Sequence, residues 1–347
     1  MPDFSAFPLP LNIAIFAGAA VLVWIAGTRL AGYGDEIAER SGAGEALIGL
    51  LLLAGVTSLP EIATSVTAAG IGQAPLAVNN LLGSIAMQVA VLAVADAAIG
   101  RRALTSVVPD PVVMLQGALN VCLLCLVAIA ALVGDVAFGG AGLWTWGLAA
   151  ATLLALNKLV EANRREPWIA NTGEDLAGEP VQNDQMQVSN ARLGASTALA
   201  ALVILAAGST VALTGDVIAR QSGLGASFMG YAFVAIATSL PEASTVFAAL
   251  RRGLYTMAIS DILGTNILNM LLLFVVDLVA PGGAVMSSAG PFAAVGALTG
   301  AFVTGLFLVG LAERRDRTVF GMGTDSAAVL AGYAGGLVIL FTLRGAP

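Results

Sequence analysis

The sequence contains no histidine, and its 347 residues include only two cysteines. Without histidine, the chain cannot build a histidine-ligated zinc or haem site, or a nucleophile activated by an imidazole. Cys122 and Cys125 have the spacing of a redox pair, but they lie one helical turn apart inside an apolar run. We therefore interpret them as small buried apolar residues, and we expect no disulfide framework and no bound cofactor.

Charged residues are also scarce. They make up 11% of the chain, against about 25% in ordinary soluble domains. Hydrophobic residues account for 58%, and the mean hydropathy is +0.91. This composition is typical of an integral membrane protein whose partners are membrane lipid and small solutes. The net charge of −7 gives no reason to expect nucleic acid as a partner.

Ten apolar runs are long enough to cross a bilayer as helices of about 20 residues. A polar stretch at residues 162–192 separates the first five from the last five and is too short for a core of its own. The runs are 11–31, 46–69, 74–99, 107–133, 141–160, 194–218, 227–250, 255–279, 291–311 and 326–343. We therefore expect an all-α integral membrane protein with ten transmembrane helices, five in residues 1–161 and five in 193–347, joined by a cytoplasmic linker.

The positive residues fall almost entirely into alternate loops. Of the 15 lysines and arginines, 13 follow the odd-numbered apolar runs, and only Arg220 and Arg344 lie on the other side. Loops rich in lysine and arginine stay in the cytoplasm. The sequence therefore predicts that both termini lie outside.

The sequence repeats itself at a constant offset, which pairs Glu61 with Glu242. Residues 34–64 read GDEIAERSGAGEALIGLLLLAGVTSLPEIAT, and residues 215–245 read GDVIARQSGLGASFMGYAFVAIATSLPEAST. This repeat offset also pairs Gly83 with Gly264 and Asp96 with Asp277. Because five spans is an odd number, the second copy must enter the membrane upside down. Inverted repeats with broken helices are an architecture of secondary transporters; a duplication kept only for packing is the alternative.

The pentapeptide TSLPE occurs once in each copy, inside an apolar run. Pro60 and Pro241 have no N–H group, so each interrupts its helix and releases carbonyl oxygens about one turn earlier. Glu61 and Glu242 follow directly, where an uncompensated charge costs at least ~2.5 kcal/mol. If the two copies face each other, the carboxylates converge and cannot both stay ionised unless a cation joins them. The motif therefore predicts a cation site built from hard oxygen ligands, which sodium and calcium favour.

The next run in each copy carries polar residues on one helix face. Residues four positions apart share a face of a helix. Two matched sets have this spacing: Asn80, Ser84 and Gln88 in the first copy, and Asp261, Thr265 and Asn269 in the second. Any one of them alone would more often join helices than bind an ion, but the matched faces favour ligands.

The paired TSLPE motifs, each followed by a Gly-Ser or Gly-Thr helix, resemble the two alpha repeats of the calcium/cation antiporter superfamily, in its sodium/calcium exchanger branch. The resemblance covers residues 34–96 and 215–277, with the alpha motifs at 54–96 and 235–277. It implies exchange of Na⁺ for Ca²⁺ by alternating access, with ions bound by Glu61 and Glu242. By position, the other implied ligands are Ala54, Thr57, Ser58, Ser84 and Gln88 in the first repeat, and Ala235, Thr238, Ser239, Thr265 and Asn269 in the second.

The chain departs from the usual pattern of this family at a few positions. Ile85 and Gln88 stand where asparagines are usual, and Asn269 stands where some relatives have an aspartate. These positions therefore give the site two formal charges rather than three, which leaves the stoichiometry and the preferred ion open. Asp261 pairs with Asn80, and we expect it to supply charge near the site or to face a cytoplasmic access path.

Other functions are also open on the sequence. Proton-coupled exchange of Ca²⁺ or another divalent cation is the nearest one, since a pair of glutamates can also carry protons. A passive channel is less favoured by the proline-broken inverted repeat. The string GYGD at residues 32–35 is the one hint of an intramembrane aspartyl protease, but it has no Tyr-Asp partner. The linker is too short for the calcium-sensing domains of animal exchangers, and we expect a non-enzymatic transporter in the plasma (inner) membrane of a prokaryote.

Overall fold

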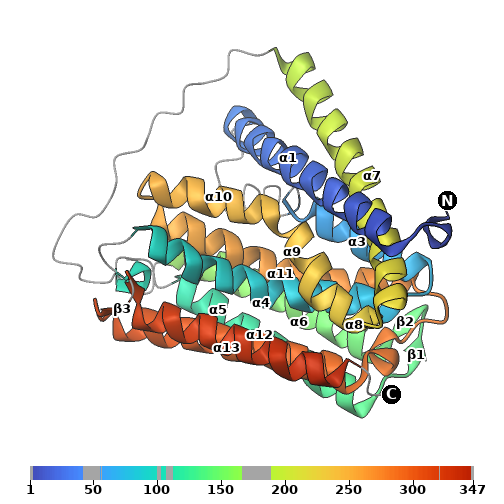
Figure 1. Ribbon diagram of the computed structural model, residues 1–347. Coiled ribbons are helices and arrows are strands. Elements are labelled where there is room, and N and C mark those ends of the chain that lie inside the picture. The colour runs from blue at the N-terminus through green and yellow to red at the C-terminus, as the bar shows by residue number, and fades with distance from the viewer. Residues whose placement is uncertain are drawn as a thin grey trace.

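Helices make up almost all of the chain that the computed structural model describes, namely residues 3–41, 55, 57–99, 103–106, 112–165, 189–319 and 321–344 (Figure 1). The first half comprises η1 (Phe4–Ala6), α1 (Leu9–Ser41), α3 (Leu59–Gly70), α4 (Ala74–Ile99), η2 (Leu104–Ser106), α5 (Val112–Val133), β1 (Ala137–Phe138), β2 (Ala141–Gly142) and α6 (Leu143–Arg165). The second half comprises α7 (Asn190–Ser222), α8 (Ala226–Phe228), the π-helix η3 (Met229–Val234), α9 (Ala235–Thr238), α10 (Leu240–Arg251), α11 (Tyr255–Val279), α12 (Val285–Glu313), β3 (Thr318–Val319), β4 (Met322–Gly323) and α13 (Thr324–Leu343).

Eight helices of the described residues are long and apolar enough to cross a membrane. A ninth span results if Ala226–Thr238 and Leu240–Arg251, which meet at a bend of 46°, are taken together. The one remaining predicted span, 46–69, falls partly on residues outside the described ranges, and α3 makes up most of its described part. Most of the predicted linker, residues 166–188, is likewise outside them. The all-helical membrane fold is confirmed, while the count of ten spans and the outside position of both termini stay predictions.

The two halves of the chain pack against each other in matched pairs. α1 packs against α7, α4 against α11, and α5 against α12. Contacts between non-equivalent helices also come in twos, since α3 contacts α7 as α10 contacts α1, and α6 contacts α11 as α13 contacts α4. The hairpins β1–β2 and β3–β4 are related by the repeat offset and lie at opposite ends of the molecule (Figure 1). Equivalent elements therefore run in opposite directions, as an inverted repeat predicts.

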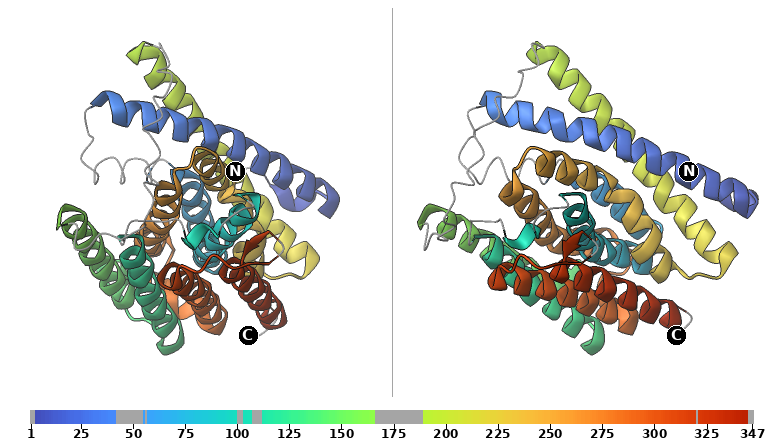
Figure 2. Two further views of the ribbon diagram at one scale, coloured as in Figure 1. Left: turned by 90° about the vertical axis from the view of Figure 1, so that its left-hand side faces the viewer. Right: turned by 60° about the vertical axis from the view of Figure 1, so that its left-hand side comes forward.

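Helices α1 and α7 stand apart from the rest of the bundle. In every view they cross each other on one side, while α12 and α13 lie on the opposite side (Figure 2). Their main partners outside this pair are the helices around the two TSLPE motifs, α3 for α7 and α9 and α10 for α1. The motif helices therefore lie between the α1–α7 pair and the remaining bundle.

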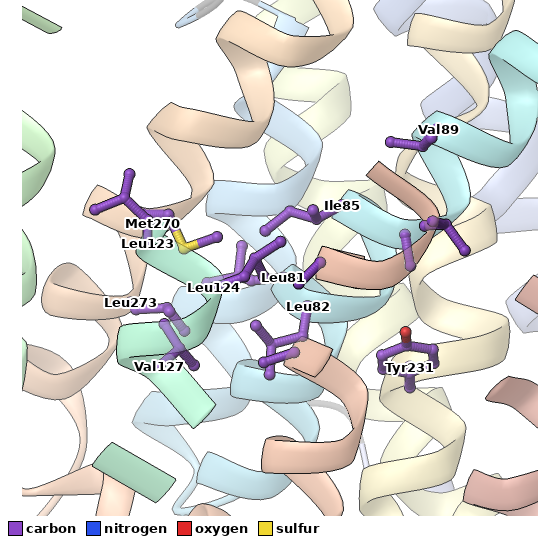
Figure 3. Close-up of a cluster of buried hydrophobic side chains, with 14 of the residues drawn as sticks. Leu81, Leu82, Ile85, Val89, Leu123, Leu124, Val127, Tyr231, Met270 and Leu273 are labelled. Atoms are coloured by element: carbon purple, nitrogen blue, oxygen red, sulfur yellow. The ribbon is translucent and has the colours of Figure 1, made fainter. Parts of the chain in front are cut away.

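The centre of the bundle is an apolar cluster around α4. Figure 3 shows Leu81, Leu82 and Ile85 of α4 directed toward α5 and α11, where they meet side chains such as Leu124 and Met270. These five side chains are fully buried. Because lipid is as apolar as leucine, close packing rather than exclusion from water stabilises such contacts inside a membrane.

Glycine lets the backbones of α4 and the π-helix η3 approach each other. A Cβ atom on Gly83 would overlap the carbonyl oxygen of Tyr231, and one on Gly230 would overlap the carbonyl oxygen of Leu76. The repeat offset pairs Gly83 with Gly264 in the sequence, and the structure identifies η3 as the neighbour that requires a glycine at Gly83. This crossing fixes the helix that leads into the second TSLPE motif against α4.

A matched glycine turn follows each motif helix. Gly72 and Gly253 have φ angles of +78° and +76°, a region that glycine enters without steric cost. Their N–H groups bond to the carbonyls of Ala69 and Leu250 at 2.9 and 3.0 Å. The two turns end α3 and α10 in the same way and reverse the chain into α4 and α11.

A buried aspartate joins the two halves at one end of the bundle. Asp96, near the end of α4, is fully buried. Its Oδ1 accepts from the backbone N–H of Leu104 at 2.7 Å, and its Oδ2 accepts from the N–H of Gly323 in the β3–β4 hairpin at 2.7 Å. One carboxylate thus ties a segment of its own half to a hairpin of the other half.

Asp277 makes the equivalent contacts at the opposite end. It accepts from the N–H of Val285 at 2.8 Å and from the N–H of Gly142 in the β1–β2 hairpin at 2.6 Å. The repeat offset relates each of these partners to its counterpart around Asp96. The pairing of the two aspartates in the sequence therefore reflects two clamps, each formed between the halves.

The expectation for the cysteines is wrong in one respect. Both are free thiols, but Cys122 is exposed on the outer face of α5, and Cys125 is partly exposed. An outward cysteine faces lipid in a membrane protein, where a small apolar side chain needs no partner. No redox role follows from the position of either thiol.

Candidate ion-binding site

The two TSLPE motifs form matched helix breaks. Ser58 precedes α3, and Ser239 separates α9 from α10. Pro60 and Pro241 occupy the first turn of the helices that follow. Since Pro241 cannot donate a hydrogen bond to the carbonyl of Ala237, that oxygen is left free for another partner. The predicted disruption of the helix before each glutamate is therefore present in the second repeat, and α3 begins at the same point of the first.

Helices α1 and α7 each place a glycine against one of these breaks. A Cβ atom on Gly27 of α1 would overlap the ring of Pro241, and one on Gly208 of α7 would lie 2.8 Å from the Cβ of Ala63 in α3. The repeat offset pairs Gly27 with Gly208. In addition, Thr64 donates to the carbonyl of Gly208 at 3.2 Å. The α1–α7 pair therefore contacts both motifs through equivalent positions.

Both glutamates are enclosed by the protein. Glu61 and Glu242 are each 0% exposed and lie in the first turn of α3 and α10, where the helix dipole favours a negative charge. Ser239 donates to Oε1 of Glu61 at 3.4 Å. Among the described residues, the second oxygen of Glu61 and both oxygens of Glu242 have no hydrogen-bond partner. A buried carboxylate in this condition needs either a bound cation or a proton.

Oxygen-bearing side chains of the two halves meet beside the glutamates. Ser84 and Thr238 place their hydroxyl oxygens 3.4 Å apart, and Thr238 lies 3.4 Å from Oδ1 of Asn80. Gln88 approaches the hydroxyl of Ser239 at 3.5 Å. These separations exceed the roughly 2.8 Å of an ordinary hydroxyl hydrogen bond, so the groups touch only loosely. Helix α4 of one half thus faces the break of the other half.

Helix α11 contributes two further buried side chains. Thr265 and Asn269 are both 0% exposed, and α11 packs against α3, α4 and α10. Among the described residues, the hydroxyl of Thr265 and both amide atoms of Asn269 have no hydrogen-bond partner. Polar groups buried in this way are rare in folded proteins, which identifies them as candidates for a ligand.

The structure accounts for the predicted site residues as follows. Glu61, Ser84, Gln88, Thr238 and Ser239 are joined across the two halves by the contacts above. The other predicted ligands that the structure describes are also buried, namely Thr57, Ser58, Ala235, Glu242, Thr265 and Asn269. Asp261 is partly buried and contacts Thr245, and Ala54 lies outside the described residues.

Two residues belong beside this set although the family resemblance does not imply them as ligands; the sequence placed Asn80 on the same helix face as Ser84 and Gln88, and it did not identify Ser65. Asn80 contacts Thr238 and donates to the hydroxyl of Ser65 at 2.9 Å. Ser65 follows Glu61 by four residues, and Asn80 precedes Ser84 by four. Helical spacing from a predicted ligand is the signal that identifies both.

The donor set limits what the site can hold. No group of three or more His, Cys, Asp and Glu side chains that could hold a metal occurs in the described part of the chain. An ion between Glu61 and Glu242 would therefore be bound by carboxylates together with neutral hydroxyl, amide and carbonyl oxygens. Hard cations such as Ca²⁺ and Na⁺ prefer these donors.

Comparison with known proteins gives a family match over nearly the whole chain. The profile of a family described as sodium/calcium exchanger protein matches residues 11–156 and 192–342. The inner membrane protein YrbG of Escherichia coli is 27% identical over 278 residues, which cover 78% of this chain and 81% of that protein.

Three solved structures have a similar fold. The first, of a protein named YfkE, has a TM-score of 0.68 at 14% identity and covers 96% of this chain and 97% of its own. An H⁺/Ca²⁺ exchanger named CAX has a TM-score of 0.65 at 12% identity, with coverage of 96% and 85%. The sodium-calcium exchanger NCX_Mj has a TM-score of 0.56 at 17% identity, with coverage of 95% and 99%.

Proposed function

Because the chain belongs to the sodium/calcium exchanger protein family, we propose that it exchanges Na⁺ for Ca²⁺ across a membrane by alternating access, with the ions bound between Glu61 and Glu242. Family membership itself makes the chain a cation/calcium antiporter and a transporter rather than an enzyme. One observation carries the finer proposal. Two fully buried glutamates lie at equivalent helix breaks, and most of their oxygens have no partner in the described part of the chain.

The spacing of the oxygens supports a bound cation. Two oxygens that each lie about 2.4 Å from a Ca²⁺ ion, at right angles, are about 3.4 Å apart. The pairs Ser84–Thr238 and Ser239–Glu61 are each separated by 3.4 Å. One divalent ion, or several monovalent ions, would neutralise the two carboxylates that burial makes costly.

The charge of the empty site supports exchange rather than one-way leak. A buried site of charge −2 without a cation is costly to enclose in a low dielectric. The loaded forms, with calcium or with sodium, carry little net charge. The protein should therefore change the accessible side mainly when loaded, which couples the two ion flows.

The position of α1 and α7 supports alternating access. Gly27 places α1 against the break of the second repeat, and Gly208 places α7 against the break of the first. A shift of the α1–α7 pair along the motif helices would cover one side of the site and uncover the other.

The proposal includes the ten-span topology with repeats at 1–161 and 193–347, both termini outside, and 162–192 in the cytoplasm. Figure 1 supports the shared location of the two termini, because both lie at the same end of the molecule.

The proposed location is the plasma (inner) membrane of a prokaryote. The relative YrbG is named as an inner membrane protein, and the two chains are similar over most of their lengths. The alternate distribution of positive loops supports the same orientation.

Reconstituted protein tests the choice of ions. Proteoliposomes loaded with sodium should take up radiolabelled calcium from a sodium-free medium, and replacing internal sodium by choline at fixed pH should abolish uptake. The reason is that outward sodium flow supplies the free energy for inward calcium flow. Uptake that ignores the sodium gradient and collapses with the pH gradient would overturn sodium coupling.

Proton-coupled exchange of Ca²⁺ or another divalent cation is the second candidate. The observation that favours it is the fold, which is more similar to the H⁺/Ca²⁺ exchanger CAX, at a TM-score of 0.65, than to NCX_Mj, at 0.56. Carboxylates can also bind protons in place of sodium. The sequence motifs favour sodium, and the choline experiment separates the two.

A further inference from the structure

The two halves of the site differ at one charged position. The repeat offset pairs Asn80 with Asp261. Asn80 is fully buried, and both ends of its amide are engaged, by Ser65 and by Thr238. Asp261 carries a charge and is only partly buried. The symmetry of the site is therefore broken in charge and in exposure.

Thr245 contacts both Asp261 and the backbone of Glu242, which lies on the same helix α10. The hydroxyl of Thr245 lies 3.3 Å from Oδ2 of Asp261 and 2.9 Å from the backbone carbonyl of Glu242. Glu242 itself is fully buried. Asp261 thus lies one hydroxyl group away from the backbone of Glu242, and it is only partly buried as a residue, although its Oδ1 atom is enclosed.

The position of Asp261 along its helix places it toward one end of the bundle. Helix α11 begins at Tyr255, so Asp261 lies about 9 Å from that end at about 1.5 Å per residue. The same end carries the turn after α10, with the exposed Arg251 and Arg252. Asn80 has the equivalent position near the start of α4, which lies toward the opposite end in the inverted copy.

Further polar groups lie next to α11, where α5 of the other half packs against it. Ser260 donates to the side chain of Gln116 at 3.0 Å, and one turn later Asn120 of α5 is fully buried with neither amide atom bonded among the described residues. The repeat offset places Ala297 and Ala301 at the two equivalent positions of α12. The polar side chains that α5 places next to α11 are therefore replaced by alanines at the equivalent positions of α12.

We propose that Asp261 attracts cations on one of the two approaches to the site and favours calcium over sodium on that face only. The inference rests on the proposed function of the Glu61–Glu242 site. A fixed charge attracts a cation with an energy proportional to the charge of the cation, and this raises the association rate of a divalent ion more than that of a monovalent ion. The neutral, engaged Asn80 gives the opposite approach no such preference.

The test is the variant Asp261→Asn, which keeps the shape of the side chain and removes its charge. Apparent affinities for calcium and sodium are measured separately at each face, in right-side-out and inside-out membrane vesicles. On the face of the α10–α11 turn we expect calcium affinity to fall about tenfold and sodium affinity about threefold, because the energy doubles with cation charge. On the opposite face neither value should change.

Two further variants make the result specific. Glu313→Gln removes a carboxylate that is 54% exposed near the end of α12, outside the site, and should leave all four affinities unchanged. Asp261→Glu keeps the charge and should keep calcium affinity within about twofold of wild type. This variant still tests the inference if Asp261→Asn does not fold.

Three outcomes of these measurements would overturn the inference: unchanged affinities in Asp261→Asn, equal changes at both faces, or equal factors for the two ions. The last would indicate altered packing rather than lost charge. Failure of the proposed function is visible separately, because the wild-type protein would then show no sodium-dependent calcium exchange, and the inference would fall with it.

Discussion

At the scale of single residues, Glu61 and Glu242 carry the chemistry of the site. We expect Glu61→Gln and Glu242→Gln each to reduce exchange by about ten- to a hundredfold. The loss of one charge removes a charge-assisted contact to the ion. Hydrogen bonds to charged groups are each worth about 1.5–3 kcal/mol. Radiolabelled calcium uptake into proteoliposomes measures the effect. Glu313→Gln is the matched control, since it makes the same chemical change at an exposed position.

The outcome that would contradict this site is specific. Both variants should still elute as folded protein in detergent, because neutral glutamine is less costly to bury than an unpaired carboxylate. Sodium-dependent calcium flux near the wild-type rate in either variant would place the ions elsewhere.

Much of the site could be predicted from residue spacing, and the rest depended on packing between helices. The identical TSLPE motifs locate both glutamates and both helix breaks, since proline and a buried acid act locally. The four-residue spacing of Asn80, Ser84 and Gln88 predicts their common face. Spacing alone does not reveal that Thr238 of the other half meets Ser84, because that contact depends on how α4 crosses α9.

At the scale of elements, the contact of α1 and α7 with the breaks should limit transport. We expect Gly27→Ala and Gly208→Ala to slow exchange severalfold and to cost about 1–3 kcal/mol of stability, as overpacked positions do. The added methyl groups would overlap Pro241 and Ala63. Initial rates of calcium uptake and thermal unfolding in detergent measure the two effects.

The same two helices supply the controls. A methyl group added at Gly18 of α1 or at Gly194 of α7 would meet no atom within 4 Å, so Gly18→Ala and Gly194→Ala should leave rate and stability unchanged or slightly improved. If all four variants behaved alike, close packing on the breaks would not be the cause.

Helix positions follow closely from hydropathy, whereas their irregularities do not. The runs predicted at 74–99 and 255–279 match α4 and α11 to the residue. The run predicted at 291–311 lies inside the longer α12, where Gly290 has non-helical angles of 59° and −164° directly before Pro291. A hydropathy window detects the straight segment after the kink, and it cannot detect the segment before it. The π-helix η3 likewise depends on its crossing with α4.

At the scale of the whole molecule, the aspartate clamps hold the two halves together at both ends. We expect Asp96→Asn and Asp277→Asn each to lower the unfolding temperature by several degrees. Each carboxylate accepts hydrogen bonds from two backbone N–H groups, and the NH₂ group of asparagine cannot accept one of them. Each such lost bond to a charged group costs about 1.5–3 kcal/mol. Thermal unfolding in detergent measures the shift.

The distance between the two aspartate clamps gives a second prediction, for the variant that lacks both. The clamps lie at opposite ends of the bundle, so the double variant should show the sum of the two shifts. Asp3→Asn is the control, because Asp3 is exposed and bonds to the neighbouring Ser5. An unchanged unfolding temperature in both single variants would show that the clamps do not stabilise the fold.

Since the ions are proposed to bind between the halves, calcium should stabilise the molecule as a whole. A ligand at one hundred times its Kd adds about 2.7 kcal/mol to the free energy of unfolding. We therefore expect calcium to raise the unfolding temperature of the wild-type protein by several degrees and removal of calcium with a chelator to reverse the shift. Glu61→Gln should lose this response because it lacks one of the two carboxylates, while Asp96→Asn, although less stable, should keep it because its clamp lies away from the ions. A calcium response that persists in Glu61→Gln and disappears in Asp96→Asn would place the ion at the clamp instead of between the helix breaks.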